Sequence, residues 1–191
     1  MIGKRYEVGI LSNVLLAAFV AAMFSGCVVS FSNPLPASQP VGRDDRLLGK
    51  WEGQDEQKNP ISIRFEPGSI HETKLSVSGS LGYQNPIFRM VTTKISGNDY
   101  MILRLNDPNA DKDYMVVRYA TNDDKLTVCL LNVDRVKEAI KKGKLKGQID
   151  YSQWGGAIIT ESSKSVLSFL KSPDNKNMFT CLPELKKVTS K

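Results

Sequence analysis

The sequence is poor in the residues that most often carry chemistry. Its 191 residues include one histidine, His71, and three cysteines, none of which stand at the short spacing of a metal site. It contains neither a nucleophile elbow nor an HExxH motif. We therefore expect His71 to be an exposed side chain, and we expect no enzymatic activity, no metal and no cofactor.

Concentrated charge is also missing. The formal net charge is +6, but the basic residues are scattered and no RNA- or DNA-binding motif occurs. We therefore expect no nucleic-acid partner. With 41% hydrophobic and 24% charged residues, the composition is that of a globular protein, and the length fits one domain preceded by a leader.

Residues 1–26 have the layout of a signal peptide. Lys4 and Arg5 precede an apolar run over residues 14–24, after which small residues follow. This order corresponds to the charged, apolar and cleavage regions of a secreted chain. The alternative is an uncleaved membrane helix, because residues 8–29 are mostly apolar and long enough to span a bilayer.

Residues 24–27, Phe-Ser-Gly-Cys, resemble the lipobox of bacterial lipoproteins, although that family prefers leucine at the position of Phe24. The resemblance implies cleavage after Gly26, a diacylglycerol thioether on Cys27 and acylation of the new amino terminus. Several acyl chains anchor a protein firmly to a membrane. Since Val28 rather than aspartate follows the cysteine, the resemblance implies the outer membrane, with the protein facing the periplasm.

Residues 27–43 have the composition of a flexible, lipid-anchored tether. Pro34, Pro36 and Pro40 stand among small and polar residues. Prolines hold such a segment extended at ~3.1 Å per residue, so it could lift a domain up to ~50 Å from a membrane. A first edge strand is the alternative, and the alternating prolines disfavour it. The remaining residues, 44–191, are expected to form a single globular β-rich domain.

Most of this domain alternates between apolar and polar residues. Ile61, Ile63 and Phe65, for example, share one face, and a period of two indicates half-buried strands. Strands are predicted over 61–65, 74–78, 86–95, 101–105, 113–120 and 125–131, with further ones at 157–160 and 178–182. Short turns such as Gly97-Asn98 separate them, so we expect neighbouring strands to be antiparallel.

Two segments late in the chain change to a helical period. Val133, Val136 and Ile140 predict a helix that Asn132 caps and that stops near Gly143. A second helix is predicted over 163–171, with Ser162 as its cap and Pro173 after its end. The predicted fold class is mainly β (α+β): an antiparallel meander of about eight strands, closed into a barrel, with two short late helices.

Gly49-Lys50-Trp51 is similar to the Gly-X-Trp signature on the first strand of lipocalins. The resemblance implies a lipocalin-like barrel in which Trp51 packs at the closed end beneath an arginine of a late strand. No arginine follows Arg135, so that partner is missing or replaced. The alternative is a tryptophan that fills an unrelated β core.

A barrel of eight strands encloses at most one small ligand. Candidate ligand-binding residues are Trp51 and the inward-facing Met101, Leu103 and Val117, with Trp154 in a loop at the mouth. Inside a secreted protein, Cys129 and Cys181 are candidates for a disulfide or for two buried thiols. Lys137, Lys141 and Lys144 lie at helical spacing and could bind anions, although such a face is usually only solvated.

Two functions fit these features, and we expect the first, with the second as its alternative. The first is a membrane-anchored envelope lipoprotein that binds a small apolar or amphipathic ligand. The second is a structural or interaction lipoprotein that contacts envelope proteins or cell wall and holds no small molecule. The membrane, through lipid on Cys27, is the expected partner in both cases, and the sequence does not indicate the oligomeric state.

Overall fold

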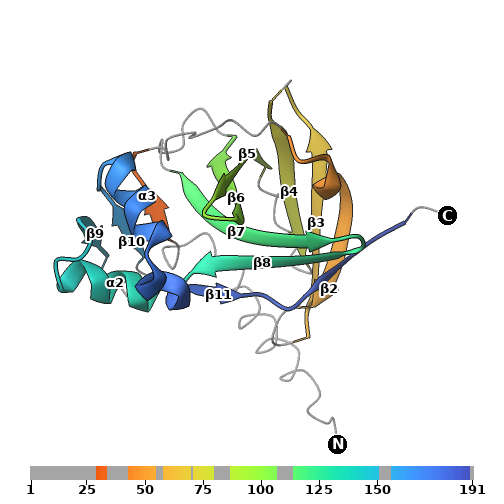
Figure 1. Ribbon diagram of the computed structural model, residues 1–191. Coiled ribbons are helices and arrows are strands. Elements are labelled where there is room, and N and C mark those ends of the chain that lie inside the picture. Colours follow the sequence, from red (N-terminus) through yellow and green to blue (C-terminus); the bar gives the residue numbers. More distant parts are fainter. Residues whose placement is uncertain are drawn as a thin grey trace, which may run out of the picture.

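The computed structural model describes residues 29–33, 43–54, 58–69, 71–79, 87–106, 114–150 and 156–189. The predicted signal peptide, Cys27 and Trp154 lie outside these ranges. Within them the fold is mainly β, as the alternating sequence pattern predicts. It consists of an antiparallel barrel, a small separate sheet and two short helices late in the chain (Figure 1).

The barrel is a meander of eight strands that closes on itself. Each strand pairs with the next from β2 to β8, and β12 lies between β8 and β2 to complete the circle. The strands are β2 (Gly49–Gln54), β3 (Pro60–Pro67), β4 (Thr73–Gly79), β5 (Ile87–Ile95), β6 (Asn98–Leu105), β7 (Met115–Asn122), β8 (Lys125–Leu131) and β12 (Leu185–Lys187). The short strand β11 (Phe179–Cys181) pairs with β8 beyond the end of β12.

Tight turns join the hairpin strands, and the turn predicted at Gly97-Asn98 lies one residue earlier, because Asn98 already belongs to β6. The β5–β6 hairpin turns through Ser96 and Gly97, with φ of 50° and 83°. Two successive positive φ values match the right-handed twist of the flanking strands, and glycine adopts them without strain. Asp123, with φ of 47°, lies in the turn between β7 and β8. These tight turns fix the register of the hairpins.

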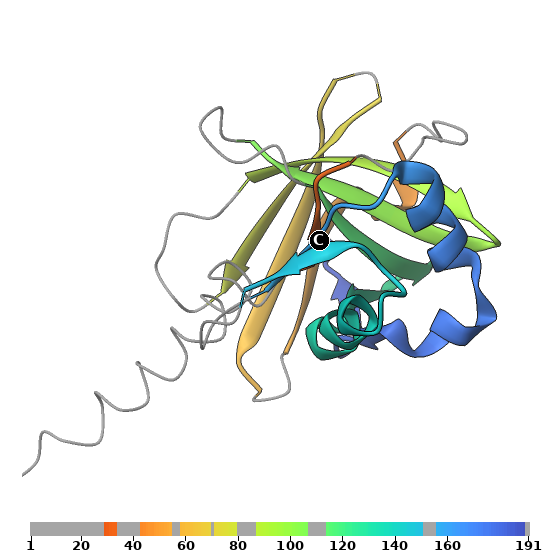
Figure 2. The same cartoon turned by 90° about the vertical axis from the view of Figure 1, so that its left-hand side faces the viewer.

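The alternation along the strands produces two apolar cores. Side chains that point into the barrel form the inner core, which includes Trp51, Phe65, Met90 and Leu126. Side chains on the outer face of β5 to β8 form a second core together with the helices and the small sheet. Figure 2 shows these outer elements lying side by side in front of the barrel wall.

The helices of the outer layer begin and end as predicted. Helix α2 spans Val133–Lys141, with the Asn132 side chain accepting a hydrogen bond from the Arg135 backbone N–H. Helix α3 spans Ser163–Lys171, with the Ser162 hydroxyl accepting from the Ser165 N–H. Two short 3₁₀ helices complete the described part of the fold: η1 (Asp45–Leu47) and η2 (Pro173–Met178).

The small sheet has the order β1 (Val29–Phe31), β10 (Ala157–Ile159) and β9 (Gly147–Ile149). Strands β1 and β10 are parallel, which departs from the all-antiparallel expectation. The predicted tether over 27–43 is also wrong for residues 29–33, because these are bonded into the fold. The edge strand that the prolines disfavour is therefore present at its first residues, and its partner has no local sequence signal, because Val29 pairs with Ala157, 157 − 29 = 128 residues later.

Candidate functional site

The four inward-facing residues predicted to line a ligand site do meet inside the barrel. Trp51, Met101, Leu103 and Val117 belong to the same core and are 0%, 1%, 6% and 3% exposed. Met101 and Val117 are direct cross-strand neighbours on β6 and β7. These side chains are covered by one another and by the rest of the inner core, so they fill the barrel at this level instead of presenting a surface.

One end of the barrel is closed by η1. The indole N–H of Trp51 donates to the Leu47 carbonyl oxygen at 2.7 Å, and both residues are 0% exposed. Lys187, on the last strand β12, lies with its Nζ 5.2 Å from the centroid of the Trp51 ring. The same ammonium donates to the Arg46 carbonyl oxygen at 3.1 Å. Trp51 is therefore held between the barrel core and a cation that also holds η1.

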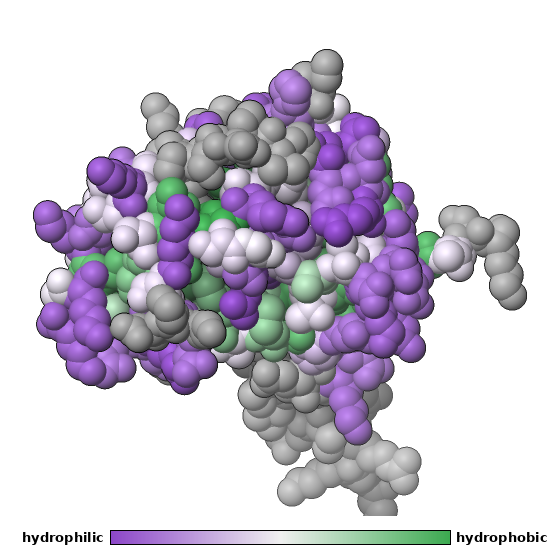
Figure 3. Space-filling model, in the orientation of Figure 1, coloured by the Kyte–Doolittle hydropathy of each residue, from purple (hydrophilic) through white to green (hydrophobic). Residues whose placement is uncertain are grey.

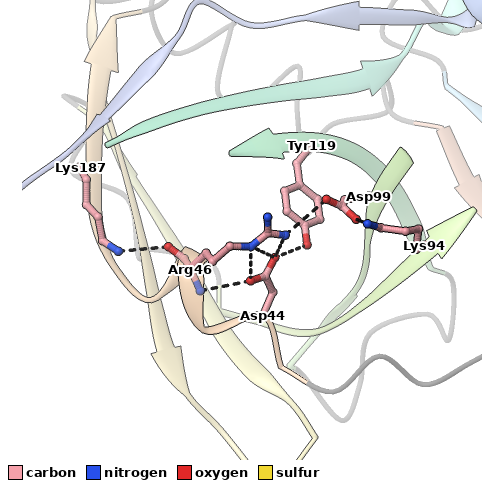
Figure 4. Close-up of polar contacts among 6 residues, drawn as sticks. All are labelled: Asp44, Arg46, Lys94, Asp99, Tyr119 and Lys187. Carbon is pink, nitrogen blue, oxygen red and sulfur yellow. Dashed lines mark hydrogen bonds and ion pairs between the residues drawn. The ribbon is translucent and has the colours of Figure 1, made fainter. Parts of the chain in front are cut away.

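A group of polar side chains surrounds this closed end (Figure 4). The Tyr119 hydroxyl donates to Asp44 Oδ2 at 2.8 Å, and Arg46 Nη2 donates to the same oxygen at 2.7 Å. Arg46 also lies 3.4 Å from Asp99, whose other carboxylate oxygen is 3.4 Å from Lys94. Asp44 is the N-cap of η1, since its side chain accepts from the Arg46 backbone N–H.

The surroundings shift the pKa values of Asp44 and Tyr119 in opposite directions. Burial raises the pKa of the Asp44 carboxyl, but the hydrogen bonds from Arg46 and Tyr119 outweigh it and leave the pKa below its ordinary value of 3.8. Burial, and then the hydrogen bond to Asp44, raise the pKa of Tyr119. At neutral pH Asp44 is charged and Tyr119 is protonated. These interactions suit the group to holding η1 in place.

The opposite end of the barrel is less completely buried. Inner-core residues there are only partly buried, and they include Ile61, Val77, Met115 and Leu130. Leu105, at the end of β6, is 36% exposed. Residues 55–57, 80–86 and 107–113, which follow β2, β4 and β6 in the chain, lie outside the described residues.

Cys129 and Cys181 form a disulfide. They are directly opposite each other on the antiparallel strands β8 and β11. Cys129 is 5% exposed, while Cys181 lies at the surface. The bond ties β11, and through it the last segment of the chain, to the barrel wall.

The three lysines predicted to share a helical face do not all do so. Lys137 and Lys141 lie on α2, where Lys137 is half-buried and Lys141 is exposed. Lys144 lies beyond the end of the helix, after Gly143 with φ of 68°. The left-handed conformation at Gly143 redirects the chain, so Lys144 extends from the turn that follows the helix.

His71 is exposed in the turn between β3 and β4. Among the described residues no three histidine, cysteine, aspartate or glutamate side chains gather as a metal site. In the same part of the chain, no helix combines the length and the apolar character needed to cross a membrane.

The closed end contains polar and charged residues that sequence reasoning missed, namely Asp44, Arg46, Tyr119 and Lys187. Asp44 precedes a turn in the manner of a helix cap, and this signal could have been found. Tyr119 is on the inward face that the alternation of β7 defines. Its pairing with Asp44, 75 residues away, has no sequence signal.

The protein is an eight-stranded, closed antiparallel β-barrel. Its inner core includes Trp51, which lies beneath Lys187 of the last strand. Comparison of the chain with protein-family models, with curated proteins and with solved structures finds no match.

Proposed function

We propose that the protein is an envelope lipoprotein, anchored by lipid on Cys27, whose barrel is a packed scaffold that contacts envelope proteins or cell wall. The anchoring rests on the signal peptide and on the lipobox-like residues 24–27. The scaffold role rests on the inner core. Trp51, Met90 and Met101 are at most 1% exposed, and a barrel of eight strands has little internal volume beyond that of its own side chains.

The closed end supports a lipocalin-like architecture for this scaffold. The Gly-X-Trp resemblance implies a late-strand cation over the tryptophan. Lys187 has that relationship to Trp51, and it also bonds the backbone of the preceding 3₁₀ helix. A lysine would then replace the arginine of the resemblance.

A second candidate is the binding of a small apolar or amphipathic molecule at the less buried end. The partly buried Ile61, Val77 and Met115, together with the exposed Leu105, favour it. In this case the ligand would occupy the mouth and not the level of Met101. Trp154 is part of this proposal from the sequence alone, since it lies outside the described residues.

One pair of measurements separates the two candidates. Protein purified from membranes is extracted with organic solvent, and the extract is analysed for bound lipid by mass spectrometry. The delipidated protein is then titrated with N-phenyl-1-naphthylamine, whose fluorescence rises in apolar sites. For the scaffold we expect neither a stoichiometric lipid beyond the covalent anchor nor saturable probe binding. Saturable binding that Leu105→Glu abolishes would overturn the scaffold role in favour of the second candidate.

A further inference from the structure

The predicted lipid attachment site lies very close in sequence to the folded domain. A single residue, Val28, separates Cys27 from Val29, the first residue of β1. Two residues of fully extended chain span at most about 7 Å. The chain between Cys27 and β1 is therefore at most about 7 Å long.

Strand β1 is firmly bonded along this first segment. Val29 pairs with Ala157 and Phe31 with Ile159 on the neighbouring strand β10. On its other side the Phe31 N–H donates to the Tyr114 carbonyl oxygen at 2.8 Å, and the Tyr114 N–H donates back at 2.9 Å. The strand is thus bonded on both edges.

The side chains of β1 are also packed into the fold. Phe31 is 1% exposed and Val29 is 5% exposed, and both belong to the outer core with Val116 and Ile102. After the strand, the Asn33 side chain donates to the Glu161 carbonyl oxygen at 3.0 Å. Lengthening the anchor by detaching β1 would expose Phe31 to water and break these hydrogen bonds, so the folded domain keeps the short connection.

We propose that lipid on Cys27 holds the folded domain directly against the phospholipid surface, with the small sheet toward the bilayer and β3 away from it. This inference rests on the proposed lipidation. The proline-rich residues between β1 and η1 then connect two parts of the domain and do not serve as a spacer from the membrane. The domain has a fixed orientation on the membrane.

The orientation follows from the order of strands around the barrel. Strand β1 contacts β7, and β3 is four places from β7 in the circle of eight. Figure 1 shows the small sheet and both helices on one side of the barrel, and β3 and β4 on the other. The anchor therefore enters on the side of the outer core.

The charge of this side suits an anionic phospholipid surface. Lys141, Lys142, Lys144 and Lys146 are exposed between the end of α2 and the start of β9. Gly147 pairs with Ile159, which pairs with Phe31, so this basic turn begins two strand spacings, or roughly 10 Å, from the Phe31 end of β1, which is the end farther from Cys27. Figure 3 shows hydrophilic side chains around a smaller apolar area on the face where the helices meet the barrel.

The test compares two labelled positions on the lipidated full-length protein. Gln148 is exposed on β9, in the same sheet as β1, and Arg64 is exposed on β3. Gln148→Cys and Arg64→Cys each carry a fluorophore. The proteins are reconstituted in vesicles of phosphatidylethanolamine and phosphatidylglycerol that contain a lipid with a nitroxide on its headgroup. The control for each is the same protein with about 20 Gly/Ser residues inserted between Cys27 and Val28, which adds an r.m.s. reach of ~25 Å.

Stronger quenching at position 148 than at position 64, with loss of the difference in the linker control, is the expected result. Equal quenching at the two positions without the linker would overturn the fixed orientation, and so would quenching that the linker does not change. The intact mass of each preparation is measured first. A mass without lipid would overturn the proposed lipidation and, with it, the inference. A protein that carries lipid but whose two labels are quenched equally would overturn the fixed orientation alone.

Discussion

The ammonium of Lys187 lies 5.2 Å from the centroid of the Trp51 ring and donates to the backbone carbonyl of Arg46. One side chain on the last strand of the barrel thus contacts both the first strand and the 3₁₀ helix before it. This relationship closes the barrel end, and it predicts a stability loss when the lysine is removed.

Lys187→Ala should lower the free energy of unfolding by about 1 kcal/mol, because it removes one cation–π contact and one hydrogen bond. Lys187→Arg should retain most of the stability, since a guanidinium can make both interactions. Urea unfolding followed by tryptophan fluorescence gives the free energy of unfolding of each variant. Lys186→Ala is the matched control, because the neighbouring Lys186 is exposed. Equal effects of Lys186→Ala and Lys187→Ala would contradict the capping role.

Asp44 predicts a specific dependence of stability on pH. Its pKa in the folded protein is below its ordinary value of 3.8, so the charged form is favoured by folding. Its contribution is therefore fully present above about pH 4 and is lost as the pH falls through the lower folded-state pKa. Asp44→Asn should destabilise the protein at pH 7, and the difference from the unmodified protein should shrink in acid.

Asp45→Asn is the control for this measurement, because the side chain of Asp45 is 70% exposed. Chemical unfolding of the three proteins between pH 2 and pH 7 gives the comparison. A constant difference between Asp44→Asn and the unmodified protein across this range would show that the carboxylate of Asp44 gains nothing from its partners.

Replacing Met101 with alanine tests whether side chains fill the interior of the barrel. The side chain is 1% exposed in the inner core, and removing a large buried side chain leaves a cavity that costs about 2–5 kcal/mol. Met101→Ala should therefore lower the free energy of unfolding by an amount in this range. Lys74→Ala, at an exposed position of β4, should have little effect. A loss of less than about 0.5 kcal/mol for Met101→Ala would indicate unfilled space around it.

The disulfide should stabilise the protein chiefly through the unfolded chain. Cys129 and Cys181 are 52 residues apart, and closing a loop of this size is worth about 4 kcal/mol in the chain-entropy description. Unfolding midpoints with and without dithiothreitol measure the effect. The variant with both cysteines replaced by alanine should match the reduced protein and should not respond to the reductant. A midpoint that reduction leaves unchanged would contradict this prediction.

The sequence predicts most of this fold because most of the determinants are local. Alternation identifies the long strands such as β5 and β6, and the caps Asn132 and Ser162 identify the starts of both helices. The sequence predicts neither of the three-residue strands β9 and β12, and it favours a tether where β1 lies, with an edge strand only as the alternative. Three residues are too few to establish a period, and the partners of β1 and β12 are distant in the chain.

The closed end could be predicted only in part. The resemblance at Gly49-Lys50-Trp51 implies an arginine of a late strand over Trp51, and Lys187 lies there in its place. The inward side of Tyr119 follows from alternation, but its bond to Asp44 joins residues on separate elements. Contacts of this kind depend on the closure of the barrel, which no stretch of sequence encodes by itself.

The lipid anchor on Cys27 is the central claim, and the intact mass of protein extracted from membranes tests it most directly. We predict a chain that begins at Cys27 and carries added diacylglycerol and acyl mass. A Cys27→Ala variant should lose this mass and leave the membrane fraction. A full-length, unmodified mass would contradict the lipid anchor and would leave the apolar leader, residues 1–26, as part of the finished protein.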